Sequence, residues 1–176
     1  TRALGLLRAE ADALETIETL LASSNHMEYR QVLIVDRSGN TTVHSGEHTL
    51  GTWAEAATKN AAAAGNLLAN TSVPKAMIHT FEETETITMH LGDRLLNSMR
   101  AGLQAGGEEG PIHSAGFKVV DRLSWPIVDL RVDWTEDCPI TELDKLWARY
   151  KPQMDDYVTR ALDPATAPSY GVPGDK

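Results

Sequence analysis

Apolar residues at the start of the chain recur with the period of an α-helix. They follow one another at steps of three and four, which places them on one helical face: Leu4, Leu7, Ala11, Leu14, Ile17 and Leu21. This pattern predicts a single helix over residues 2–22. Thr1 occupies the N-cap position of that helix, and residues 23–25 form a polar stop.

The next segment has the pattern of two strands. Residues 31–36 read Gln-Val-Leu-Ile-Val-Asp, and residues 41–45 follow a turn that contains glycine. Two such runs around a short glycine-containing turn predict a β-hairpin. Its first strand has branched apolar side chains on both faces, so we expect cover on both sides: Val32 and Ile34 on one face, Leu33 and Val35 on the other.

The rest of the chain mixes helical and strand patterns. We expect helices over residues 72–83, 91–105 and 140–162, the last kinked at Pro152, and strands over residues 115–121 and 127–133. The secondary structure of residues 54–69 is ambiguous from the sequence, because their alanines favour a helix but Gly65 and Asn66 would interrupt it. Together these elements predict an α+β layered domain over residues 1–162, followed by a Pro/Gly-rich tail over residues 163–176.

Composition narrows the function classes. The chain has 176 residues, 25 acidic and 16 basic side chains and a net charge of -9, and its basic residues do not cluster. This argues against nucleic acid as a partner. No apolar run approaches the ~18 residues of a membrane span. With Cys138 as the single cysteine, an intrachain disulfide is excluded, so we expect a reducing, cytoplasmic compartment.

Single residues that suggest chemistry have simpler interpretations. His44 and His48 are four apart, but a strand end and a glycine separate them, so we favour a structural role and expect no metal and no cofactor. Asp129 and Asp133 flank Arg131 on one strand face, which favours an ion-pair ladder over substrate binding. A Ser-His-Asp arrangement around His113 lacks the Gly-x-Ser-x-Gly turn.

Several segments together resemble a bacterial family, the domain-of-unknown-function family 1028, which is grouped with the N-terminal-nucleophile (Ntn) hydrolases. They keep order and spacing over the whole chain: Arg30-Gln31, residues 44–51, the Gly-Asn-Leu-Leu of residues 65–68, Gly106-Gly107, His113-Ser114-Ala115, residues 128–131 with Asp133, and residues 167–175. The resemblance implies a four-layer αββα sandwich of two sheets with helices outside. It also implies a strand, not a helix, over residues 61–66.

The resemblance places two or more strands before the segment that begins at Arg2. A sheet without its first strands exposes edges and an apolar face. We therefore expect a separate, shorter N-terminal chain from the same precursor, cut immediately before Thr1. The processed pair is expected to form a homo-oligomer through the aromatic last helix and the tail.

Such a cut would make Thr1 a nucleophile. The α-amine of a terminal threonine, with a pKa of roughly 7.7–8.0, can accept the hydroxyl proton. Asn66 would then donate to the oxyanion, and Arg30, His113 and Arg131 would hold a polar group of the substrate. The expected function is an Ntn-type amidohydrolase acting on a small amide, cyclic imide or acyl-amino compound.

Other interpretations stay open beside the hydrolase. Thr1 can instead be a helix cap at a processing or cloning boundary. The protein can be a non-catalytic small-molecule-binding or scaffold protein on the same fold. It can also be an uncleaved enzyme whose catalytic residue lies in the N-terminal segment.

Overall fold

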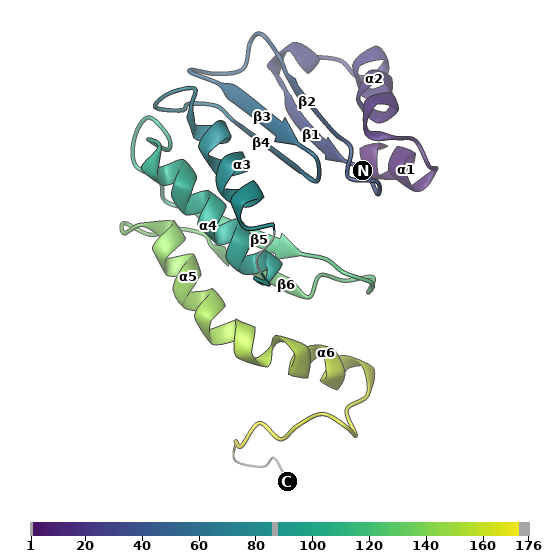
Figure 1. Cartoon of the computed structure of the whole chain (residues 1–176), viewed down its shortest axis with the longest axis vertical. Helices are drawn as coiled ribbons and strands as arrows, with labels where there is room; N and C mark the ends of the chain where they lie inside the picture. Colours follow the sequence, from purple (N-terminus) through teal and green to yellow (C-terminus); the bar gives the residue numbers. More distant parts are fainter. Residues whose placement is uncertain (1, 86–87, 173–176) are drawn as a thin grey trace. The chain divides into compact units, whose positions relative to one another are not determined.

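A computed structural model describes residues 2–85 and 88–172 and divides the chain into two compact units, Thr1–Pro111 and Ile112–Lys176 (Figure 1). The prediction of one domain over residues 1–162 stays a prediction. The first unit contains α1 (Arg2–Arg8), α2 (Ala13–Ser23), the 3-10 turn η1 (Met27–Tyr29), β1 (Gln31–Val35), β2 (Thr41–Ser45), β3 (Ala54–Thr58), β4 (Ala61–Gly65), α3 (Val73–Glu83) and α4 (Leu91–Gln104). The second contains β5 (Ala115–Val119), β6 (Val128–Val132), α5 (Pro139–Tyr150), the 3-10 turn η2 (Lys151–Gln153) and α6 (Met154–Leu162).

The prediction of one helix over residues 2–22 is wrong, because the segment forms the two helices α1 and α2. Glu10 between them has a φ of 69°. Asp12 caps α2: its Oδ1 accepts the Glu15 N–H at 2.8 Å, and Glu15 Oε2 accepts the Asp12 N–H at 3.1 Å. This reciprocal pair is a capping box, which starts a new helix inside the apolar stripe.

The first hairpin forms as expected. Strands β1 and β2 pair antiparallel, in a register that runs from Gln31 opposite Ser45 to Val35 opposite Thr41. On one face, Ile34 is buried and packs with residues of α2. On the other face, Leu33 and Val35 are 41% and 43% exposed, so the expectation of cover on both sides is met in full on the α2 face only.

The alanine-rich segment forms a second hairpin of β3 and β4; the resemblance implied a strand over residues 61–66, which corresponds to β4, but did not imply β3. A two-residue turn, Lys59-Asn60, joins the strands, and Asn60 has a φ of 71°. Asparagine tolerates this left-handed conformation, which two-residue hairpin turns require. The Asn60 N–H donates to Gly39 O at 2.8 Å, so the tips of the two hairpins are joined. Tertiary contacts therefore outweigh the helix propensity of alanine.

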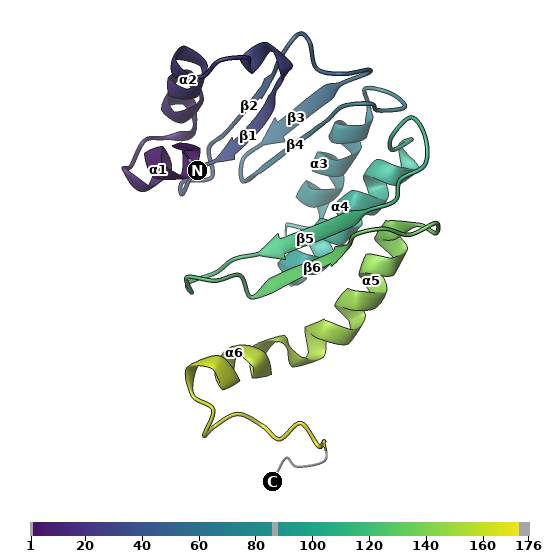
Figure 2. The same cartoon turned by 180° about the vertical axis from the view of Figure 1, so that it is seen from behind.

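The two hairpins lie between helices within the first unit. Thr41 Oγ1 donates to Thr58 O at 2.8 Å, which ties β2 to β3. Helix α2 contacts the outer side of β1–β2, and α3 contacts β3–β4 with α4 beyond it (Figures 1 and 2). The result is a mixed α/β unit of small antiparallel sheets and helices, and the complete four-layer sandwich stays a prediction.

The second unit packs the β5–β6 hairpin against α5. Its core contains Val128 and Leu143, which are fully buried, and Phe117, whose ring meets Trp147 edge-on with centroids 5.4 Å apart. Both strands were expected. Pro152 lies in the turn η2, which separates α5 from α6, as the predicted kink requires. Within the residues described, no helix has the length and apolarity needed to cross a membrane.

Candidate functional site

An open groove with a volume of about 540 Å³ lies in the first unit. It brings together two residues that the sequence singled out, Arg30 and Asn66, although 35 residues separate them in the chain. The other lining residues lie in the turn η1, at the start of β1 and in the loop after β2: Tyr29, Gln31, His48, Thr49 and Leu50.

The Arg30 side of the groove is held by main-chain contacts. The turn η1 lies against the loop after β2: the Gly46 N–H donates to Arg30 O and the His48 N–H to Glu28 O, both at 2.8 Å. His44 Nε2 donates to Met27 O at 2.9 Å. A Cβ on Gly46 would lie only 2.2 Å from Glu28 O, so the close approach requires glycine.

The Asn66 side of the groove follows β4. The flanking Leu67 N–H donates to Leu50 O at 3.1 Å and fixes the chain there. The Asn66 amide reaches the same carbonyl only at 3.4 Å, which is long for a hydrogen bond. Asn66 is exposed, so its amide group can turn to a ligand in the groove.

The electrostatics of the groove suit an anion. Among the residues that the structure describes, the Arg30 guanidinium makes neither a hydrogen bond nor an ion pair, and none of the lining residues is acidic. The His48 ring packs on Tyr29 with centroids 5.0 Å apart, and His48 Nε2 lies 3.8 Å from Glu47 Oε1. In a chain with a net charge of -9, an unpaired arginine in an acid-free groove is a feature that a ligand anion would complement.

The other predicted site residues do not line this groove. Thr1 lies outside the described residues. His113 and Arg131 belong to the second unit. Arg131 Nε pairs with Asp133 Oδ1 at 3.1 Å, whereas Asp129 Oδ2 pairs with Lys118 Nζ of β5 at 2.9 Å, so the expected ion-pair ladder forms only in part.

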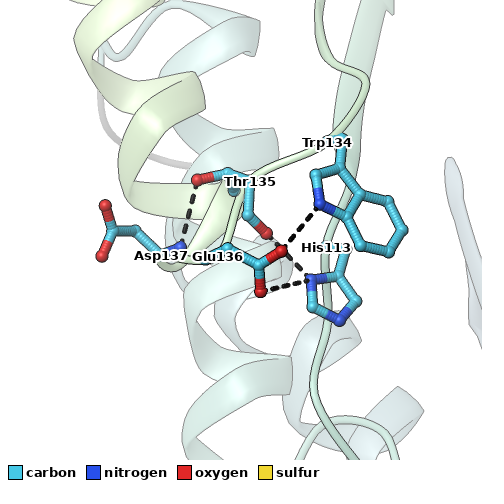
Figure 3. Close-up of polar contacts among 5 residues, drawn as sticks. All are labelled: His113, Trp134, Thr135, Glu136 and Asp137. Atoms are coloured by element: carbon cyan, nitrogen blue, oxygen red, sulfur yellow. Dashed lines mark hydrogen bonds and ion pairs between the residues drawn. The ribbon is translucent and has the colours of Figure 1, made fainter.

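His113 lies in a polar cluster that the sequence did not predict (Figure 3). Its ring stacks on Trp134, with centroids 4.1 Å apart and an interplanar angle of 7°. His113 Nδ1 lies 2.9 Å from Thr135 O, which can only accept, so Nδ1 carries a proton. Glu136 accepts the Trp134 indole N–H at 3.0 Å. In neutral His113 this arrangement leaves the lone pair on Nε2.

The remaining candidates have structural surroundings. His44 is engaged with Met27 O, and no cluster of three potential metal ligands occurs among residues 2–85 and 88–172. Cys138 precedes α5 at its N-cap position. Hydrogen bonds from the Thr141 side chain and from the Thr141 and Ile140 N–H groups lower the pKa of its thiol, against the opposing effect of burial.

The structure is an α+β protein built from two-stranded hairpins with helices packed against them. It has one candidate anion site, the groove lined by Arg30 and Asn66. The chain belongs to the family of unknown function DUF1028, which matches residues 1–143. It is also similar to the crystal structure of a DUF1028 protein from Silicibacter pomeroyi, with 25% identity and a TM-score of 0.74. The similarity covers 85% of this chain but only 65% of that one. No curated protein matches the chain.

Proposed function

We propose that the groove between Arg30 and Asn66 binds a small molecule that carries a carboxylate or a similar anionic group. The observation that carries this proposal is the unpaired Arg30 guanidinium in a groove without acidic lining residues. A guanidinium presents parallel N–H groups that match a carboxylate in a bidentate pair. The volume of about 540 Å³ falls within the range of small-molecule sites.

The lining residues also suggest the shape of the ligand. Tyr29 and His48 offer ring surface, and Leu50, which is 66% exposed, offers an apolar patch. Asn66, which also lines the groove, supplies both a donor and an acceptor. A flat molecule with one negative charge and one further polar group uses all of these side chains.

The test compares two matched probes, benzoate and its neutral amide benzamide, by isothermal titration calorimetry and ligand-observed NMR. We expect benzoate to bind more tightly than benzamide, and Arg30→Gln to remove this preference. Arg37→Gln is the control, because Arg37 is an exposed arginine paired with Glu10 at 3.1 Å. Equal binding of both probes, or a preference that survives Arg30→Gln, would refute the proposal.

A second candidate is the Ntn-type amidohydrolase with Thr1 as the nucleophile. Two observations favour it: the order helix, hairpin, hairpin, helix in the first unit, and a weakly engaged Asn66 amide that could donate to an oxyanion. Its substrate would be a small amide, cyclic imide or acyl-amino compound. A β-lactone probe should label Thr1 and leave Thr1→Ala unlabelled; label on another residue, or none, would exclude Thr1 as the nucleophile.

The same candidate includes a partner, a shorter N-terminal chain from the same precursor that pairs with β1. Two observations support it: among the residues that the structure describes, no third strand pairs with the β1–β2 sheet, and Leu33 and Val35 are partly exposed on β1. Intact-mass analysis of the purified product of the complete gene should find two chains, the larger beginning at Thr1. We expect this pair of chains to form a homo-oligomer. A single uncut polypeptide would contradict the cleavage.

A further inference from the structure

We propose that the ligand of the groove is an N-acyl amino acid, and that Gln31 recognises its amide N–H group. This inference rests on the anion site proposed above, because Arg30 would hold the carboxylate of the ligand. It adds the second polar group of the ligand, and it follows from the hydrogen bonds that fix the side chain of Gln31.

The Gln31 side chain is held by two acceptors that do not line the groove. Gln31 lies directly opposite Ser45 in the β1–β2 hairpin, and its Nε2 donates to Ser45 Oγ at 2.9 Å and to Gly65 O at 3.2 Å. The Ser45 hydroxyl donates its own proton to Glu55 Oε2 at 2.6 Å. Ser45 Oγ therefore has only lone pairs left for Gln31, and the Gly65 carbonyl can only accept.

These hydrogen bonds determine which end of the Gln31 amide is available to a ligand. Turning the amide over would place its oxygen against two acceptors, so Nε2 must face Ser45 and Gly65. Gln31 lines the groove, and its Oε1 is not buried and accepts no hydrogen bond from the residues that the structure describes. Gln31 consequently offers the ligand a fixed acceptor and no donor.

The polar groups of the groove match the parts of an N-acyl amino acid. The Arg30 guanidinium suits the carboxylate, Gln31 Oε1 can accept from the amide N–H, and the weakly engaged Asn66 amide can donate to the acyl carbonyl. A free amino acid fits less well, because its ammonium group would share the groove with a guanidinium and meet no acidic lining residue. The groove should therefore select a neutral nitrogen over a charged one.

Two matched pairs of probes test the inference by isothermal titration calorimetry. Hippurate and benzoyloxyacetate share their ring and carboxylate, and differ only in an amide N–H that the second replaces by an ester oxygen. We expect hippurate to bind about tenfold more tightly, because the ester leaves Gln31 Oε1 without a donor. N-Acetylphenylalanine should likewise bind more tightly than phenylalanine, which carries an ammonium group.

Gln31→Met tests the assignment to this side chain, since methionine keeps its length but lacks the carbonyl acceptor. We expect the preference for hippurate over benzoyloxyacetate to disappear in this variant. Gln153→Met is the matched control and should keep the preference, because Gln153 belongs to the second unit, where its Nε2 donates to Arg149 O at 2.8 Å. Urea unfolding of both variants shows whether each is folded.

The outcomes separate this inference from the proposed function. Three results overturn the choice of ligand even where benzoate is still preferred over benzamide: equal binding of hippurate and benzoyloxyacetate, phenylalanine binding as tightly as its N-acetyl form, or a hippurate preference that survives in folded Gln31→Met. Equal binding of benzoate and benzamide overturns the anion site itself. Both probe pairs are measured on the unmodified chain, so they decide even if Gln31→Met does not fold.

Discussion

Replacing Gly46 by alanine tests how the groove is built. The new Cβ would lie 2.2 Å from Glu28 O and 2.5 Å from Met27 O, where unstrained contacts need about 3.5 Å. Both neighbours are backbone atoms, so the turn η1 must move by more than about 1 Å. That shift breaks the hydrogen bonds from Gly46 to Arg30 and from His48 to Glu28, each now 2.8 Å long.

The magnitude follows from these losses. Overpacking costs about 1–3 kcal/mol, and two lost hydrogen bonds cost about 0.5–1.5 kcal/mol each. We therefore expect Gly46→Ala to lower the free energy of unfolding by about 2–6 kcal/mol, which is a large part of the stability of a typical domain. It should also abolish any preference for benzoate, because Tyr29 and Arg30 move with the turn.

The assay is urea unfolding followed by circular dichroism, with hydrogen exchange of residues 27–31 and 44–50 as a local readout. Gly5→Ala is the matched control. Gly5 lies in α1 with no heavy atom within 4 Å of an added Cβ, so alanine should raise stability by up to about 1 kcal/mol. The reasoning fails if Gly46→Ala unfolds at the urea concentration of the unmodified chain.

Three further outcomes are expected. Leu143→Ala should cost about 2–5 kcal/mol in urea unfolding, because Leu143 is fully buried; a cost below 1 kcal/mol would argue against its place in the core. Alkylation of Cys138 by iodoacetamide should have a lower pH midpoint in the folded chain than in urea, since Thr141 lowers the thiol pKa, and Thr141→Val should raise the folded midpoint; coinciding midpoints would contradict this. Burial raises the pKa of Tyr150, so its ultraviolet titration should lie at higher pH than that of tyrosine in the unfolded chain. The free energy of unfolding should therefore fall as the pH rises from the pKa of the unfolded tyrosine towards that of folded Tyr150. Tyr150→Phe should remove this high-pH titration step, and it also loses the 2.8 Å hydrogen bond to Ile127 O.

The secondary structure was predictable where local chemistry and tertiary contacts agree. A continuous apolar run predicted β1, alternating apolar residues predicted β6, and Pro152 predicted the break after α5. The break between α1 and α2 was visible in Asp12 and Glu15, but the apolar stripe continues across it, so periodicity alone predicted one helix. Residues 54–65 could not be decided from propensity, because the hydrogen bond from Asn60 to Gly39 joins two hairpins distant from each other in sequence.

The candidate site was predictable only in part. Arg30 and Asn66 were named from sequence, and they do line one groove. Their neighbour Tyr29 was missed, and His48 was given only a structural role, because loop backbone contacts around Gly46 place both residues there and these contacts leave no periodic signal. The stacking of His113 on Trp134 likewise joins residues 21 positions apart through a loop that no short pattern describes.

The backbone that shapes the groove (its frame) and the side chains proposed to bind the ligand are different groups of atoms. Substitutions can therefore change one without the other, and this makes the proposed function testable. Backbone groups of residues 27–30 and 46–48 hold the frame, whereas the Arg30 and Asn66 side chains are exposed and contribute little to it. Exposed substitutions of this kind usually change stability by less than about 0.5 kcal/mol. Loss of anion preference in Arg30→Gln with unchanged unfolding therefore reports on ligand recognition, while the same loss in Gly46→Ala with lowered stability reports on the frame. A chain in which Arg30→Gln unfolds as readily as Gly46→Ala would mean that the arginine supports the fold rather than a ligand.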